Sequence, residues 1–290
     1  MPNPFRPEYP TNAVRPVHPP AAYIGGKRHL ADRLAQRIDH APHVTFAEVF
    51  LGMGGVFLRR TRRPRAEVVN DWSQDVATLF RVLQRHYVPF LDTIKWQITG
   101  RGEFERLVAT DPETLTDLER SARFLYLQRT AYGGKVTGRT FGVDVREAGR
   151  FNVTRLQPIL EAIHERLAGV VIERLPWADF LVRYDAPGTL FYLDPPYWGS
   201  EGDYGRELFG RADFAPLVEQ LGRLKGRWIL SINATPETRA LFADFELETV
   251  ETRYSIARES NDQVAELIVY GPRPWRREIQ AGALPLEGGG

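Results

Sequence analysis

The stretch TLFYLDPPYW at residues 189–198 places an acid and two prolines directly after an apolar run. Proline lacks an N–H group and biases Asp194 toward an extended conformation, so the chain must leave a strand here. In open α/β sheets this edge binds ligands, and the Asp194 carboxylate and the Pro195 carbonyl would offer two acceptors there. An exocyclic amine has two matching N–H donors, and pairing both makes its nitrogen more electron-rich during attack on a methyl group. If the amine belongs to a nucleobase, the Tyr197 ring would stack on that base. The alternative is an ordinary strand-ending turn.

A second motif, AEVFLGMGGVFLRR at residues 47–60, places Gly52, Gly54 and Gly55 between a predicted strand and a predicted helix. Such glycines permit a tight turn and close approach of the backbone to a ligand at a helix N-terminus. The loop fits the dinucleotide fingerprint poorly, because Phe57 or Leu58 stands where a final glycine is needed. An ordinary strand-to-helix turn is the alternative. Five arginines between positions 59 and 65 are predicted to be solvated cations at the far end of that helix.

The next predicted strand ends at Asp71, about twenty residues beyond the glycine loop. One carboxylate at the end of a second strand matches the two adjacent hydroxyl donors of a ribose. Asp71 is therefore the predicted ribose ligand. Capping of the helix that follows is an alternative role, and the two roles are compatible.

Short β-branched or aromatic runs alternate with amphipathic segments, which predicts a layered α/β fold with a mainly parallel sheet. The predicted strands are 44–50, 66–71, 169–175, 189–194, 227–233 and 264–271, and the predicted helices are 28–40, 73–88, 155–168, 213–225 and 236–243. Between about 90 and 150 the chain is helical, polar and glycine-rich, without an evident sheet strand. We therefore expect an inserted second domain.

The composition limits the chemistry and the partners of the chain. It has 290 residues, no cysteine and a net charge of +1, so a cysteine nucleophile and a thiolate metal site are excluded, and a nucleic acid must be held by local cations. There is no long apolar run and no secretion signal, so we expect a cytoplasmic protein without a membrane segment. Residues 1–20 contain seven prolines and are expected to be a disordered arm, and residues 272–290 a flexible tail.

Across residues 21–271 the chain resembles the Dam-type (D12 class) N6-adenine-specific DNA methyltransferases, first through Asp194-Pro195-Pro196-Tyr197. The glycine loop looks like the family's methionine-binding loop, and YIGGK at 23–27 looks like its aromatic-x-Gly-Gly-Lys segment. The order of motifs, with the cofactor loop first, the insertion second and Asp-Pro-Pro-Tyr last, is also similar. The resemblance implies S-adenosylmethionine as cofactor, with these residues around it: Tyr23, Gly26, Lys27, Glu48, Phe50, Gly52, Gly54, Asp71, Asp179, Phe180 and Asp194.

The same resemblance implies the domain organisation and the DNA contacts. The catalytic domain, a Rossmann-like seven-stranded methyltransferase sheet, would comprise 21–72 and 169–271, and a mostly helical target-recognition insertion would comprise 73–168. Residues 124–146 mix cations, glycines and aromatics, and their beginning is similar to the Dam-type recognition loop. Expected DNA contacts are Arg129, Tyr132, Lys135 and Arg139, together with Tyr204 in a loop that would close over a flipped base. After Tyr132 the sequence departs from the pattern of GATC-specific enzymes, so the recognised site is not implied.

We therefore expect a site-specific enzyme that transfers a methyl group from S-adenosylmethionine to the N6 amine of adenine in double-stranded DNA. Asp194, Pro195 and Tyr197 would be the catalytic residues, with base flipping and without a metal or a covalent enzyme intermediate. N4-cytosine methylation is the nearest alternative, and a catalytically silent nucleic-acid-binding module is the alternative from another class. A monomer is expected. A cognate restriction endonuclease is a further expected partner unless the enzyme is phage-borne or solitary.

Overall fold

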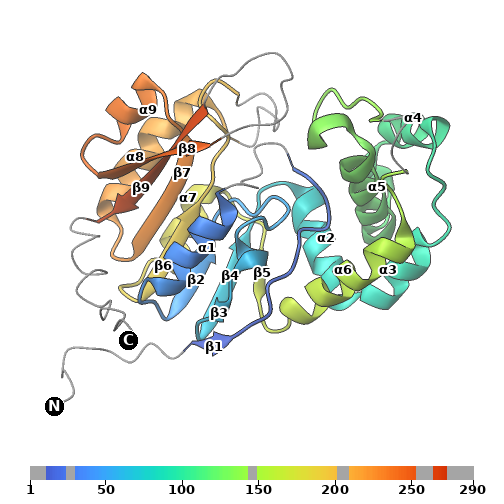
Figure 1. The fold of residues 1–290 in the computed structure, drawn as a ribbon, viewed down its shortest axis with the longest axis horizontal. Helices are drawn as coiled ribbons and strands as arrows, with labels where there is room; N and C mark the ends of the chain where they lie inside the picture. Colours follow the sequence, from blue (N-terminus) through green and yellow to red (C-terminus); the bar gives the residue numbers. More distant parts are fainter. Residues whose placement is uncertain (1–10, 24–29, 143–148, 201–208, 253–263, 273–290) are drawn as a thin grey trace, which may run out of the picture.

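One sheet of seven strands forms the centre of the larger lobe (Figure 1). The computed structural model describes residues 11–23, 30–142, 149–200, 209–252 and 264–272. In spatial order the strands are β5 (Val171–Glu173), β4 (Ala66–Asn70), β2 (Thr45–Glu48), β6 (Thr189–Leu193), β7 (Arg227–Asn233), β9 (Val264–Gly271) and β8 (Glu246–Thr252). Neighbours pair in parallel except where β9 pairs antiparallel with β7 and β8. The predicted Rossmann-like α/β fold with a seven-stranded sheet is confirmed.

Alternating side chains of each strand pack on opposite faces of this sheet, as the pleat requires. In β6, Leu190 and Tyr192 join one core, and Phe191 and Leu193 join the other. The first core contains residues of α1 (Ala31–His40) and α2 (Gln74–Arg85), and the second contains residues of α7 (Trp177–Tyr184), α8 (Phe214–Arg223) and α9 (Pro236–Leu241). Helices thus cover both faces, which explains why the central strands are almost uninterrupted apolar runs.

The path of the chain fixes where a ligand can bind. From β2 it moves outward to β4 and then β5, and after the helices that follow it returns to β6 on the other side of β2. The strand order therefore reverses between β2 and β6. In open α/β sheets a crevice opens at the carboxyl ends of the strands at such a switch point. The loops that follow Glu48 and Leu193 lie at this position.

Four helices between α2 and β5 stand beyond the β5 edge of the sheet (Figure 1). They are α3 (Tyr87–Ile94), α4 (Arg101–Ala109), α5 (Asp117–Thr130) and α6 (Val153–Arg166). The first core runs without a break from the sheet into these helices, because it joins Phe46 and Leu34 with Phe124 and Leu160. The domain boundaries at 72 and 169 therefore stay a prediction.

The expectation of disorder over residues 1–20 is wrong for residues 11–20, which lie along the larger lobe. The short strand β1 (Asn12–Ala13) pairs antiparallel with β3 (Arg62–Arg63), and Val17 N–H donates to the Leu58 carbonyl at 2.7 Å. Val17 is buried, and Arg129 donates to the Pro20 carbonyl. Prolines leave few backbone donors, and the partners of this segment are supplied mainly by the lobe that it follows. Residues 1–10 lie outside the described part.

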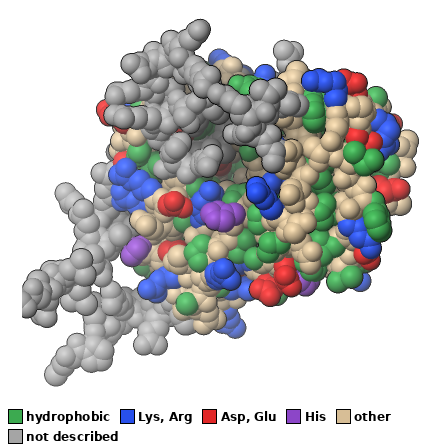
Figure 2. Space-filling model, turned by 45° about the vertical axis from the view of Figure 1, so that its right-hand side comes forward, with side chains coloured by type: hydrophobic (Ala, Val, Ile, Leu, Met, Phe, Trp, Pro, Cys, Tyr) green, Lys and Arg blue, Asp and Glu red, His purple; other side chains and the backbone are tan. Residues whose placement is uncertain are grey.

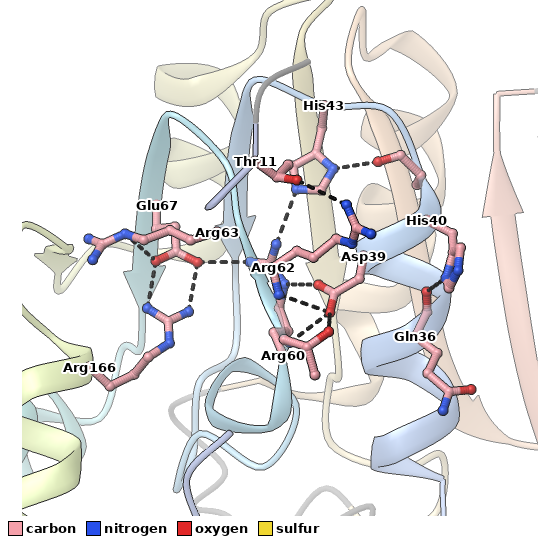
Figure 3. Close-up of polar contacts among 12 residues, drawn as sticks. Thr11, Gln36, Asp39, His40, His43, Arg60, Arg62, Arg63, Glu67 and Arg166 are labelled. Carbon is pink, nitrogen blue, oxygen red and sulfur yellow. Dashed lines mark hydrogen bonds and ion pairs between the residues drawn. The ribbon is translucent and has the colours of Figure 1, made fainter. Parts of the chain in front are cut away.

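A buried cluster of charges lies at the amino end of β4 (Figure 3). Arg60, which is 0% exposed, pairs with Asp39 at 3.0 Å and with Glu67 at 3.0 Å, and its guanidinium lies over the Phe46 ring. Arg166 reaches the same Glu67 through two hydrogen bonds of 2.6 and 2.7 Å. The prediction that the arginine run is solvated is therefore wrong for Arg60. Its sequence neighbours gave no sign of the acids that α1 and β4 bring to it.

Cations and anions are interspersed over the face shown in Figure 2 and do not gather into one basic patch. This agrees with a net charge of only +1. In the described ranges, no helix combines the length and the apolarity needed to cross a bilayer.

Candidate active site

Four polar side chains form a row on one face of the sheet, beside the switch point. They are Glu48 on β2, Tyr192 on β6, Ser231 on β7 and Glu266 on β9. These four strands are consecutive in the sheet, and the register places Glu48 opposite Tyr192 and Glu266 opposite Asn233. All four side chains are buried, although each interrupts an apolar strand. Buried polar side chains at one sheet edge indicate a site with a chemical role.

The loop that follows β6 is fixed by side chains of β7 and β9. The Asn233 side chain of β7 makes two hydrogen bonds to the backbone of Trp198. It accepts from the Trp198 N–H at 3.0 Å and donates to the Trp198 carbonyl at 3.0 Å. Glu266 of β9 accepts a short hydrogen bond from the Tyr197 hydroxyl. The Asp-Pro-Pro-Tyr loop is therefore held at its far end by two side chains for which sequence reasoning predicted no role.

Asp194 lies at the start of the same loop and is partly buried. Ser231 donates to Oδ1 of Asp194 at 3.1 Å, and the Tyr192 hydroxyl lies 2.8 Å from the Ser231 hydroxyl. Pro195, which follows, is buried. The acid thus stands where the sequence predicts it, at the carboxyl end of β6 and beside the switch point.

Glu48 ends β2 and is almost completely buried. Burial, followed by the nearby charge of Asp194, raises the pKa of Glu48 well above its ordinary value. Its Oε2 has no hydrogen-bond partner among the described residues. An unsatisfied buried carboxyl oxygen is costly, and such an atom beside a crevice suits a ligand that brings a donor or a positive charge.

The glycine loop after β2 has the backbone conformation that the sequence predicts. Gly52 and Gly54 have φ angles of +52° and +71°, which favour glycine. A Cβ on Gly52 would lie 3.0 Å from the Tyr23 ring, so the Tyr23 side chain packs directly on this loop. The predicted helix after the glycines is wrong. Only the short 3-10 helix η1 (Phe57–Arg59) follows, because the chain turns inward at Arg60 and continues into β3.

Asp71 follows β4 and connects the end of that strand to the glycine loop. Its Oδ2 accepts from the Gly52 N–H at 2.8 Å, and its Oδ1 accepts from the Ser73 N–H at 2.9 Å. Desolvation raises the pKa of Asp71 to about 6, against the opposing effect of these backbone donors. The N-cap of α2 is Ser73 and not Asp71, although Asp71 does satisfy a backbone donor at that turn.

Two residues beside Asp71 escaped the sequence reasoning. The Asn70 side chain donates to the Val49 and Leu175 carbonyls and accepts from the Leu175 N–H, which ties together the ends of three strands. Trp72 is 36% exposed, and the Arg174 guanidinium lies 5.1 Å from its ring centre. An aromatic residue directly after a strand-ending acid was the available signal for Trp72.

Asp179 and Phe180, the two residues predicted to contact the adenine of the cofactor, lie in different environments. Asp179 is exposed in the first turn of α7, on the segment that follows β5. Phe180 is 0% exposed and packs in the second core against Tyr184 and Phe191. The Phe180 ring thus contributes to the core of this structure, and its contact with a cofactor ring stays a prediction. Phe50, in the glycine loop, is partly buried and meets Phe209 edge-to-face at 5.5 Å.

The predicted DNA contacts also divide into two groups. Tyr132 is 53% exposed, and Lys135 is exposed beside it. Arg129 instead donates to the Pro20 and Arg150 carbonyls, and Arg139 donates to Gln128 and the Lys135 carbonyl. Burial lowers the pKa of both arginines. These two guanidiniums hold the fold of the loop in this structure, and their role as DNA ligands stays a prediction.

The loop that follows α5 contacts Ala22 and Tyr23, at the start of the predicted cofactor segment. Gly134 packs so closely on Ala22 and Tyr23 that an added Cβ would lie 3.0 Å from the Ala22 carbonyl oxygen. Gln128 donates to both the Ala22 and the Gly134 carbonyls. Three of the predicted site residues, Gly26, Lys27 and Tyr204, lie outside the described residues.

Comparison with known proteins agrees with this geometry. The chain is similar to the Type II methyltransferase M.CviBI of Paramecium bursaria Chlorella virus NC1A, with 23% identity over 82% of this chain and 91% of the relative. It is also similar to the Type II methyltransferase M1.LlaDCHI of Lactococcus lactis subsp. cremoris, with 24% identity over 87% of this chain and 95% of the relative.

Among solved structures, a ribosomal protein L11 methylase from Lactobacillus delbrueckii subsp. bulgaricus is similar at a TM-score of 0.35 and 10% identity, over 87% of this chain and 82% of that one. A likeness at this level does not bear on activity. The family model for D12 class N6 adenine-specific DNA methyltransferase matches residues 23–256, which is most of the chain. The chain therefore belongs to the D12 class of N6 adenine-specific DNA methyltransferases.

Proposed function

We propose that this DNA methyltransferase transfers a methyl group from S-adenosylmethionine to the N6 amine of an adenine rotated out of duplex DNA. The observation that carries the proposal is the position of Asp194. It follows β6 at the switch point, beside the buried Glu48 and the glycine loop of β2. A carboxylate acceptor and a cofactor loop at one crevice are what amine methylation requires.

The residues at the switch point fit the charge of S-adenosylmethionine, which carries a cationic sulfonium and an α-ammonium group. Glu48 on β2, Asp194 after β6 and Glu266 on β9 are three acids at the same end of the sheet, and Oε2 of Glu48 lacks a partner among the described residues. We assign Glu48 to the ammonium group, Asp71 to the ribose hydroxyls and the exposed face of Trp72 to the adenine ring. Gly52 and Gly54 would let the backbone approach the methionine part, with Tyr23, Gly26 and Lys27 beside it.

When bound, the cofactor supplies an electrophilic methyl group on a positively charged sulfur. Asp194 and the Pro195 carbonyl would accept the two amine N–H donors of the target base, which orients the nitrogen and increases its electron density. The nitrogen must lose one proton when it gains the methyl group, and the Asp194 carboxylate would take that proton. Tyr197, held by Glu266, would stack on the extruded base. Tyr132 and Lys135 would contact the DNA, and Tyr132 would fill the gap left by the base.

The protein is expected to act as a monomer, and a restriction endonuclease of the same specificity is its expected partner in a restriction-modification system. A direct test incubates the purified protein with methyl-labelled S-adenosylmethionine and random-sequence duplex DNA, digests the DNA and separates the nucleosides. N6-methyladenine is the expected product. Labelled N4-methylcytosine would overturn the choice of base, and DNA binding without any label transfer would overturn the enzymatic function.

Asp194→Ala and Asp244→Ala give a matched pair of variants for this test. Asp244 is exposed and precedes the start of β8, so it lies at the opposite end of the strands from Asp194. Loss of label with Asp194→Ala, and full label with Asp244→Ala, is expected. Unfolding of Asp194→Ala in a thermal melt would show that the Asp-Pro-Pro-Tyr loop is a structural turn.

A further inference from the structure

Ser231 and Tyr192 lie directly behind Asp194, and sequence reasoning assigned a role to neither side chain. Both come from otherwise apolar strands, and Ser231 is 0% exposed. The Ser231 hydroxyl lies 3.1 Å from Oδ1 of Asp194 on one side and 2.8 Å from the Tyr192 hydroxyl on the other. The three groups thus form a continuous hydrogen-bonded chain from the core of the sheet to the loop.

The chemistry of the three groups fixes the direction of this chain. An ionised carboxylate only accepts hydrogen bonds, so the one proton of the Ser231 hydroxyl points to Asp194. The remaining lone pairs of Ser231 can only accept, and therefore the Tyr192 hydroxyl is the donor to Ser231. Each hydroxyl in the row consequently has one assigned role, with Tyr192 donating to Ser231 and Ser231 donating to Asp194.

A serine hydroxyl alone is a rotor that turns to suit its surroundings. Here the donation from Tyr192 occupies one side of the oxygen, which leaves the hydrogen directed at Asp194. Because Ser231 and Tyr192 are buried, water does not compete for these bonds, and each is stronger than its counterpart at the surface. The carboxylate that follows β6 is thereby held in one orientation.

We propose that Ser231 and Tyr192 are positioning residues for methyl transfer, which hold the Asp194 carboxylate in its ionised form and aim it at the target amine. This inference rests on the proposed function. A misplacement of about 1 Å in a reacting geometry costs about 10²-fold in rate, so a group that fixes the acid affects the rate more than it affects substrate binding. Hydrogen bonding to the charged form also favours that form.

The pH profile of single-turnover methyl transfer separates this role from a purely structural one. The acids facing Asp194 and Tyr192 are Glu48 on β2 and Glu266 on β9, and both remain in every variant. Ser231→Ala is expected to lower the single-turnover rate about 10- to 100-fold and to move the acid limb of the profile about one pH unit higher. The affinities for S-adenosylhomocysteine and for duplex DNA should stay within about twofold.

Tyr192→Phe is expected to change the rate and the acid limb in the same direction but less, because it acts through Ser231. Added to Ser231→Ala, it should cause no further loss. Ser121→Ala is the matched control, since Ser121 is equally buried in α5 and its hydroxyl has no hydrogen-bond partner among the described residues. It should leave the rate and the profile unchanged.

The outcomes separate this inference from the proposed function. A Ser231→Ala protein with wild-type rate, or with a lower rate but an unmoved acid limb, would overturn the positioning role while methyl transfer itself stands. Additive losses in the double variant would show that Tyr192 acts independently of Ser231, which contradicts the chain. A wild-type protein that transfers no methyl group would overturn the proposed function, and the inference with it.

Discussion

The backbone N–H of Gly52 donates to Oδ2 of Asp71 at 2.8 Å, so the loop after β2 and the end of β4 form one unit. The other oxygen of Asp71 accepts from the Ser73 N–H. One carboxylate therefore fixes the glycine loop and the start of α2, and it keeps further lone pairs for the hydroxyls of a ribose. The same residue serves the fold and the proposed cofactor site.

Cofactor affinity should depend on pH through Asp71, whose pKa is raised by desolvation to about 6. Above pH 6 the carboxylate is ionised and accepts from the ribose. Below pH 6 it gains a proton and loses acceptor capacity, so affinity for S-adenosylhomocysteine should fall by up to about tenfold per pH unit. Isothermal titration calorimetry between pH 5 and 8 measures this. Asp71→Asn should bind weakly and lose the change near pH 6, whereas a wild-type affinity that is constant across this range would refute the assignment.

Glu48→Gln should stabilise the folded protein at neutral pH and weaken cofactor binding. Burial raises the pKa of Glu48 above its value in the unfolded chain, so the folded protein retains a proton there that the unfolded chain releases. Stability from this group is present at low pH and is lost as pH rises toward the folded-state pKa. The neutral amide removes that loss, and a gain of about 1 kcal/mol in the free energy of unfolding at pH 7 is typical of such site substitutions.

Urea denaturation of the wild-type and Glu48→Gln proteins at pH 5 and pH 7.5 tests this prediction. The gain should be larger at the higher pH. A Glu48→Gln protein that is less stable at pH 7.5, yet binds S-adenosylhomocysteine normally, would show that Glu48 is a structural acid and not a cofactor ligand.

Trp72 should contribute to cofactor affinity through its exposed ring face. Stacking between a base and an aromatic side chain is worth about 1–3 kcal/mol, so Trp72→Ala should weaken binding of S-adenosylhomocysteine about tenfold or more. Trp96 gives the control, because it is 79% exposed in the turn between α3 and α4. Trp96→Ala should bind normally in the same calorimetric titration. Equal affinities for the two variants would remove Trp72 from the site.

Stability should depend strongly on Glu67, which pairs with Arg60, Arg63 and Arg166. Glu67→Ala leaves the two buried guanidiniums of Arg60 and Arg166 without this anion, and losing one partner of a buried pair costs about 3–5 kcal/mol. Glu219→Ala breaks only the exposed pair with Arg223 and should cost about 1 kcal/mol or less. Guanidinium denaturation measures both. Similar midpoints for the two variants would contradict a stabilising role for the cluster.

Much of the sheet was predictable because its strands carry their own signal. Six of the seven strands begin and end within two residues of the bounds predicted from apolar or β-branched runs. The exception, β8, is an edge strand whose sequence ELETVET is mostly polar, so it lacks the uninterrupted apolar pattern of the buried strands. Disorder was wrongly predicted for residues 11–20 because their partners come from distant segments that a local composition cannot reveal.

The site was predictable where a residue type and a local turn coincide, as for Asp194 and Gly52. Ser231 and Glu266 were missed because each is a single polar residue inside a strand, and its purpose depends on which strand becomes its neighbour. The only sign of a role in the sequence was that Ser231 interrupts the apolar run ILSIN and Glu266 interrupts VAELIVYG. Phe180 and Arg129 were assigned to ligands from their surroundings in sequence, yet tertiary packing buries the first and gives the second two carbonyl partners.

The most direct test of the Asp194 assignment is the single-turnover rate of Asp194→Asn on duplex DNA with saturating S-adenosylmethionine. The amide keeps the size of the side chain but carries no negative charge, so it accepts the hydrogen bond of the target amine more weakly and cannot take the proton that the nitrogen loses. The rate should fall by about 10²–10³-fold, while the affinities for DNA and S-adenosylhomocysteine stay within about threefold of the wild type. A rate within about twofold of the wild type would contradict the central claim that Asp194 orients the attacking amine.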